Sequence, residues 1–150
     1  MTKITLLDYP PSQLGNGIHP HRISAVLISL PPDLIAGVRI YDTRTIDWIS
    51  IFDDEESSLV NVGDILETWS GGRFISAAHK VELRANRSRY SFPYFLVSIY
   101  GVLIRPFLRP AKDYSSPVIS AGAFSDKIWP SNWLQENLQE NCFNPFFKII

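Results

Sequence analysis

Short runs of β-favouring residues, each closed by proline, glycine or charged residues, recur along the chain and constrain its fold most strongly. The runs span Ala25–Leu30, Val38–Tyr41, Trp48–Phe52, Ser58–Val62, Ala78–Leu83 and Arg89–Ile99. Short strands at fairly regular spacing predict a mainly β sandwich or barrel rather than alternating β and α units. A chain of 150 residues has room for one domain of this kind.

Two helical segments are expected beside these strands. Asp64 follows Gly63 and is well placed to cap a short helical turn over residues 65–67. After Pro110 the sequence becomes turn-rich, and a short helix is predicted at Trp133–Leu138. We therefore expect a β domain over residues 1–125 and a divergent C-terminal tail over residues 126–150.

Composition narrows the classes of function. Fourteen basic and fifteen acidic residues leave a net charge of −1 without a basic block, which argues against nucleic acid or a membrane as partner. The single cysteine, Cys142, excludes an intramolecular disulfide and a cysteine-based zinc site, and fits a reducing compartment. The most apolar stretch, Phe92–Ile104, is interrupted and too short to cross a bilayer. These features predict a cytoplasmic protein.

The three histidines are placed as metal ligands could be. His19 and His21 lie two residues apart, so on a regular extended backbone both side chains point to one face. His79 opens another predicted strand sixty residues after His19. Two imidazoles from one strand and one from a neighbour can bind one transition metal, although spacing alone leaves coincidence open.

Several segments, in the same order and at matching spacings, resemble one enzyme family. They are Gly15–His21 (GNGIHPH), Ala36–Ile40 with Trp48, Leu59–Phe74 (LVNVGDILETWSGGRF), Ser76–Val81 (SAAHKV) and Arg89–Ser91 (RYS). They are similar to the G-x-G-x-H-x-D, G-L-Q-V…W, V-N-I-G-D-x-L-E-x-W, S-x-x-H-[RK]-V and R-x-S motifs of the iron(II)/2-oxoglutarate-dependent dioxygenases, isopenicillin N synthase-like group. The resemblance covers about residues 4–125.

This resemblance implies a double-stranded β-helix, the jelly-roll or cupin-like barrel, with Fe(II) as metal and 2-oxoglutarate as cosubstrate. The implied metal positions are His19, His21 and His79. The implied cosubstrate-binding residues are Arg89, Ser91 and Tyr9. A buried carboxylate of 2-oxoglutarate needs a paired cation, and Arg89 offers a two-pronged donor. Ser91, two residues on, lies on the same strand face and can add a hydrogen bond.

The chain departs from the family pattern at two points. His21 stands at the aspartate ligand position, so Fe(II), dianionic cosubstrate and ligands sum to zero charge instead of −1. An imidazole-rich shell also favours competing Ni(II), Cu(II) or Zn(II). In addition, the sequence opens at the strand that precedes the first ligand, whereas family members have a further N-terminal half before that strand. Its absence predicts exposed sheet edges that a protein partner or self-association would cover.

Two functional hypotheses follow, with a third ranked below them. The first is an oxidoreductase domain that uses dioxygen and 2-oxoglutarate to hydroxylate or desaturate a small organic substrate. The second is a catalytically inactive remnant that binds a metal or serves as an interaction module. A plain cupin-like metal or sugar binder shares the barrel but leaves the arrangement of Arg89 and Ser91 unexplained.

Overall fold

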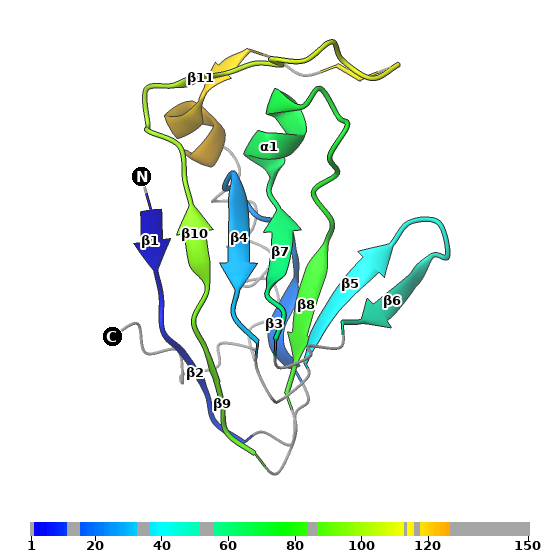
Figure 1. Ribbon diagram of the computed structural model, residues 1–150, viewed down its shortest axis with the longest axis vertical. Coiled ribbons are helices and arrows are strands. Elements are labelled where there is room, and N and C mark those ends of the chain that lie inside the picture. Colours follow the sequence, from blue (N-terminus) through cyan, green and yellow to red (C-terminus); the bar gives the residue numbers. More distant parts are fainter. Residues whose placement is uncertain are drawn as a thin grey trace.

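The computed structural model describes residues 2–11, 16–32, 37–51, 56–83, 87–112, 114–115 and 118–126. Its strands pair antiparallel in two four-stranded sheets and two short ladders (Figure 1). One sheet has the order β1 (Thr2–Ile4), β10 (Tyr94–Leu96), β4 (Leu27–Leu30) and β7 (Leu59–Val62). The other has the order β3 (Asn16–His21), β8 (His79–Glu82), β5 (Val38–Asp42) and β6 (Asp47–Ser50). The mainly β prediction is confirmed.

The first short ladder extends the first sheet. It pairs β2 (Leu7–Tyr9) with β9 (Arg89–Ser91), in the same register that β1 and β10 keep. The Thr5 amide, which donates to the Pro93 carbonyl at 3.1 Å, joins the two stretches. The single strand predicted over residues 89–99 is therefore two strands, because Pro93 has no N–H to donate to the ladder.

The second sheet is less regular at its β3 edge. Asn16 faces Glu82, Ile18 faces Val81 and His21 faces His79, so the register shifts twice along β3. From Ile18 to His21 the strand advances three residues while β8 advances two, which is the signature of a β-bulge. Pro20 lies within this stretch, and proline is tolerated at edges and bulges because it cannot donate a hydrogen bond.

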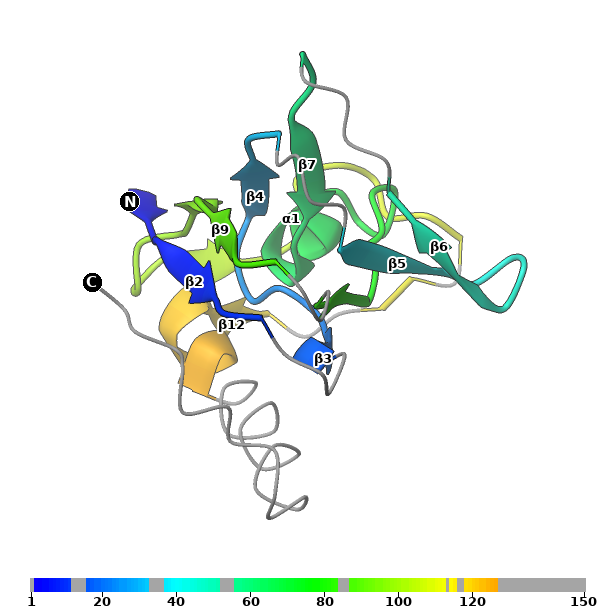
Figure 2. The same ribbon diagram turned by 90° about the horizontal axis from the view of Figure 1, so that it is seen from below.

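One end of the molecule carries the helices. This end holds α1 (Asp64–Trp69), a short helix at residues 121–126, β11 (Leu103–Ile104) and β12 (Ile119–Ser120). Figure 2 shows the molecule from the opposite end. The prediction that Asp64 caps a helix is wrong. Gly63 is the N-cap residue, and the Asp64 carboxylate is instead paired with the Arg22 guanidinium at 3.0 Å.

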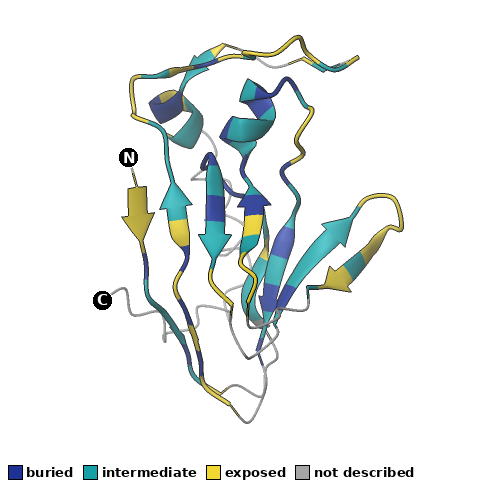
Figure 3. Cartoon of the chain, viewed as in Figure 1, coloured by how far each residue is buried: buried dark blue, intermediate teal, exposed yellow. Residues whose placement is uncertain are grey.

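The buried apolar side chains form three clusters. Their buried members are Val26, Ile65, Ile104 and Ala121; Tyr9, Val81 and Leu83; and Ile23, Ala25 and Ile28. The second cluster joins β2 to β8 and so connects the first ladder to the second sheet. Figure 3 shows buried positions along β8 and exposed residues on β1 and β6.

Among the described residues, no helix has the length and apolar character needed to cross a bilayer. The helix predicted at Trp133–Leu138 and most of the predicted tail lie outside the described residues. The division at residue 125 stays a prediction.

Candidate functional site

Two of the predicted metal ligands meet across the β3–β8 ladder. His21 and His79 are register partners, and their ring centroids lie 4.2 Å apart with the planes tilted by 51°. His79 is only 8% exposed, whereas His21 is half-buried. The adjacent strands thus place two imidazoles side by side on the same face of the sheet.

The third predicted ligand is not brought into this group. Within the described ranges, no three His, Cys, Asp or Glu side chains lie close enough to hold a metal ion together. The prediction for His19 assumed regular alternation from His19 to His21, and the bulge in that segment interrupts the alternation. The structure therefore shows a histidine pair, and the three-histidine set stays a prediction.

Hydrogen bonds orient both imidazole rings. Nδ1 of His21 lies 2.8 Å from the His19 carbonyl oxygen, and Nδ1 of His79 lies 3.4 Å from the Ala77 carbonyl oxygen. Because a carbonyl oxygen only accepts, these contacts favour a proton on Nδ1 and place the lone pair of each neutral ring on Nε2. Such a ring is ready to ligate a metal through Nε2.

Burial keeps His79 in the neutral form that ligation requires. Loss of hydration, with a smaller repulsion from His21, lowers the pKa of His79 from 6.5 to about 4. Two neighbouring imidazoles suit a divalent transition metal. The residues present thus fit part of a metal site.

The three predicted cosubstrate residues come together on the β2–β9 ladder. Tyr9 faces Arg89 in the register, and Ser91 lies two residues beyond Arg89 on the same face. All three side chains are buried, with exposures of 3% for Tyr9, 4% for Arg89 and 6% for Ser91. The Arg89 guanidinium carbon lies 5.2 Å from the centroid of the Tyr9 ring. A buried guanidinium beside a serine hydroxyl suits a carboxylate ligand.

An apolar cluster connects the cosubstrate residues to the strand that carries His79. Tyr9 packs against Val81 of β8, and Val81 shares its strand face with His79. Gly37 precedes β5 and closes the same region, because a Cβ atom there would lie 3.8 Å from a terminal nitrogen of Arg89. Sequence reasoning quoted Gly37 only as part of a motif. The sequence did offer a sign of this role, because a glycine directly before a strand often marks a close approach of neighbouring groups.

Comparisons with known proteins agree with this geometry. Residues 2–98 match the family model described as the 2OG-Fe(II) oxygenase superfamily. A curated relative, gibberellin 2-beta-dioxygenase 6 of Oryza sativa subsp. japonica, is 34% identical over 89 residues, covering 59% of this chain and 24% of the relative. This chain thus spans about a quarter of that relative's length.

Solved structures share the fold. The rice dioxygenase for auxin oxidation aligns with a TM-score of 0.78 at 20% identity, covering 87% of this chain and 47% of that one. A full-length Neurospora crassa protein, solved in complex with alpha-KG, aligns with a TM-score of 0.74 at 21% identity, covering 86% of this chain and 44% of that one. The predicted jelly-roll fold is confirmed. The chain therefore belongs to the 2OG-Fe(II) oxygenase superfamily, a family named for the metal and cosubstrate that the sequence resemblance implies.

Proposed function

We propose that this chain forms the Fe(II)- and 2-oxoglutarate-binding part of a cytoplasmic dioxygenase that hydroxylates or desaturates a small organic substrate. The observation that carries the proposal is the burial of Tyr9, Arg89 and Ser91 on one ladder face. Tyr9 packs in the same cluster as Val81, which shares its strand face with His79. A guanidinium buried on the same strand face as a serine hydroxyl is suited to bind a carboxylate anion. The far carboxylate of 2-oxoglutarate is such an anion.

Each half of the site has its own part in this proposal. Arg89 donates two hydrogen bonds to the far carboxylate, Ser91 adds a third, and the Tyr9 ring fixes the guanidinium from one side. His21 and His79 would hold the metal, with His19 as the predicted third ligand. When bound, Fe(II) supplies the redox chemistry that couples loss of carbon dioxide from 2-oxoglutarate to oxidation of the substrate by dioxygen.

A specific observation favours a second candidate. The aspartate ligand position of the family holds His21, and the described residues bring two rather than three ligand side chains together. A site with this weaker and less negative ligand set suits a metal-binding or interaction module without turnover. This candidate keeps the barrel and the cosubstrate residues but lacks the oxidation step.

The first experiment measures cosubstrate binding directly. Anaerobic titration of the purified chain with Fe(II) and 2-oxoglutarate is expected to produce a weak visible charge-transfer band. The band is expected to disappear in Arg89→Ala and in His79→Ala, and to persist in Arg87→Ala, which removes an exposed arginine two residues away. A folded wild-type protein without the band would overturn the proposed cosubstrate site.

The second experiment separates catalysis from binding. Restoring the carboxylate with His21→Asp returns the negative charge to the metal shell, and succinate formation from 2-oxoglutarate measures turnover without a known substrate. If His21→Asp forms succinate and the wild type does not, the imidazole alone blocked the oxidation step. If neither forms succinate while both show the charge-transfer band, the interaction-module candidate replaces the dioxygenase proposal.

A further inference from the structure

Arg22 links the histidine strand to α1. It directly follows His21, and its guanidinium contacts two carboxylates of the helix, with Nε 3.0 Å from Oδ1 of Asp64 and a terminal nitrogen 2.5 Å from Oε2 of Glu67. Arg22 is 47% exposed, whereas Asp64 and Glu67 are 12% and 19% exposed. The side chain therefore reaches inward from the surface to two largely buried partners.

The same Glu67 oxygen also holds the segment that leads to the other histidine. Oε2 of Glu67 accepts a hydrogen bond from the Ser76 backbone N–H at 2.7 Å, and the Ser76 hydroxyl accepts a longer one from Nε of Arg22 at 3.5 Å. Ser76 is buried and lies three residues before His79. Glu67 thus binds both Arg22, which directly follows His21, and Ser76, which lies three residues before His79.

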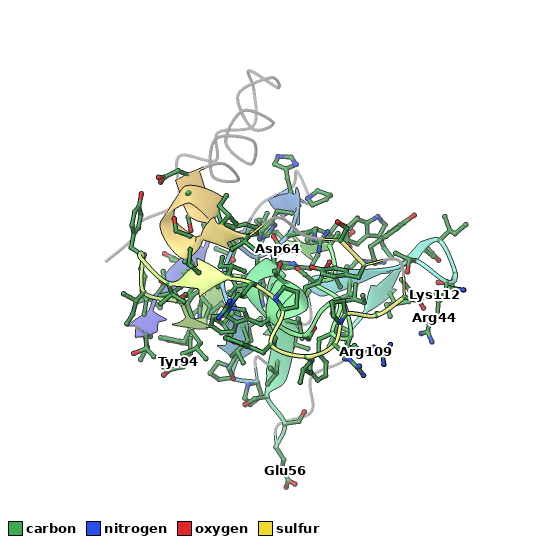
Figure 4. The ribbon with its side chains drawn as sticks, turned by 90° about the horizontal axis from the view of Figure 1, so that it is seen from above. Arg44, Glu56, Asp64, Tyr94, Arg109 and Lys112 are labelled. Carbon is green, nitrogen blue, oxygen red and sulfur yellow. The ribbon has the colours of Figure 1, made fainter. Side chains whose placement is uncertain are left out.

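This link lies where the strand ladder is irregular. The β3–β8 register shifts just before the His21–His79 pair, so regular backbone pairing does not extend through the residues that lead to the two rings. Ring positions at the end of such a ladder need support from outside it. Figure 4 shows Asp64 near the centre of the view, where α1 begins.

We propose that Arg22 is a positioning residue. Through Glu67, it ties the His21 end of β3 to the Ser76–His79 segment and so fixes the separation and tilt of the two imidazoles. The consequence for metal affinity rests on the proposed function, whereas the ring geometry is a property of the metal-free protein. Loss of a residue that orients metal ligands from outside the first shell typically weakens metal binding by about 10- to 100-fold.

A purely stabilising role makes a different prediction. Ion pairs as exposed as that of Arg22 contribute about 0–1 kcal/mol to the free energy of unfolding. A stabilising pair would lower thermal stability slightly and leave the rings in place. If Arg22 instead positions the rings, its replacement moves the two imidazoles apart even though the free energy of unfolding changes little. Ring geometry is therefore the deciding measurement.

The test compares Arg22→Gln with Arg44→Gln. Arg44 makes a two-pronged contact with Asp42 in the turn between β5 and β6, is 87% exposed, and belongs to no part of the site. In metal-free protein, nuclear Overhauser contacts between the His21 and His79 ring protons report their separation. We expect these contacts to weaken at least about twofold in Arg22→Gln, to recover in part in Arg22→Lys, and to remain unchanged in Arg44→Gln.

Titration with Co(II) alone provides the second readout. We expect about tenfold or greater weakening of Co(II) affinity in Arg22→Gln and no change in Arg44→Gln. Unchanged ring contacts in folded Arg22→Gln would overturn the inference. If the wild-type rings are in contact but Co(II) binding is insensitive to His79→Ala, the metal proposal fails while the positioning role remains supported by the ring contacts.

A fallback variant covers the case in which Arg22→Gln does not fold. Glu67→Gln keeps an oxygen that can accept from the Ser76 N–H but removes the charge that holds Arg22. The same weakening of ring contacts is expected. Unchanged ring contacts in Glu67→Gln would count against the proposal as directly as they would in Arg22→Gln.

Discussion

The strand pairs that carry the two halves of the site differ in regularity. From Thr2 to Tyr9 the chain pairs with residues 89–96 in one register, so the ladder alone places Tyr9, Arg89 and Ser91 on one face. The β3–β8 pair shifts register twice within six residues. A regular ladder positions side chains through its own backbone hydrogen bonds, whereas an irregular one depends on contacts from elsewhere in the fold.

Lowering the pH tests the histidine half of the site, because it protonates the buried His79 side chain and so lowers the free energy of unfolding. The folded protein holds the pKa of His79 at about 4, whereas an unfolded chain protonates this side chain near 6.5. Between these values the unfolded state binds more protons, so the free energy of unfolding falls as the pH falls. We expect a loss of up to about 3 kcal/mol from pH 7 to pH 4 in metal-free protein.

Urea unfolding of wild type and His79→Gln at both pH values, with a chelator present, tests this expectation. The carboxylates titrate in both proteins, so the difference between the two pH dependences isolates His79. Equal pH dependences would mean that His79 is not held neutral by burial, and the histidine half would then be more open than its 8% exposure indicates.

Glycine substitution compares the irregular β3 edge with the regular pairing of β5 and β8 in the same sheet. A Cβ atom at Gly37 would lie 2.7 Å from the Glu82 carbonyl oxygen, while one at Gly17 of β3 would lie 2.9 Å from the end of the Leu83 side chain. The Glu82 backbone is held in place by its N–H, which donates to the Gly37 carbonyl at 2.8 Å, so its carbonyl oxygen cannot readily move aside, whereas a leucine side chain can change rotamer. We expect Gly37→Ala to cost about 1–3 kcal/mol of stability and Gly17→Ala less than half of that loss.

Chemical denaturation of both variants provides the measurement. Because Gly37 also approaches Arg89, Gly37→Ala should weaken 2-oxoglutarate binding, whereas Gly17→Ala should not. Similar losses for the two variants would show that the irregular β3 edge is as rigid as the regular pairing of β5 with β8.

The regular half of the site was within reach of sequence reasoning. The spacing of Arg89 and Ser91 fixes a shared strand face, and the structure places Tyr9, which the resemblance implied as a third cosubstrate residue, opposite Arg89. The alternating apolar runs likewise predicted β4 to β8 closely, because binary pattern and turn residues act locally. The predicted strand over 89–99 was too long, since Pro93 interrupts its pairing.

The irregular half was only partly within reach. Alternation alone could not reveal that a bulge separates His19 from the His21–His79 pair, although Pro20 was an available signal of irregular pairing. Arg22 was also missed. Its partners Asp64 and Glu67 lie more than forty positions away, and no local pattern marks a contact that only the folded chain creates.

The contact between Tyr9 and Arg89 gives a smaller test, confined to the regular half. Tyr9→Phe retains a ring over the guanidinium, whereas Tyr9→Leu removes it. A buried cation–π contact contributes about 2 kcal/mol, of which binding of 2-oxoglutarate senses a part, so we expect 2-oxoglutarate to bind Tyr9→Leu about tenfold more weakly than Tyr9→Phe. Isothermal titration of the Fe(II)-loaded proteins measures the ratio. Equal affinities would show that the ring does not help to hold Arg89 in its binding position.

The smallest effect is expected on the outer face of the regular ladder. Along residues 89–94, buried Arg89, Ser91 and Pro93 alternate with exposed Tyr90, Phe92 and Tyr94, so this segment exposes its aromatic side chains to solvent. Replacing half-exposed Phe92 by threonine keeps a β-favouring residue and should change the free energy of unfolding by no more than about 0.5 kcal/mol. It should also reduce self-association in size-exclusion chromatography, because exposed apolar patches favour association. A loss above about 1 kcal/mol in urea unfolding would mean that the outer aromatic row supports the ladder that holds Arg89 and Ser91 on its inner face.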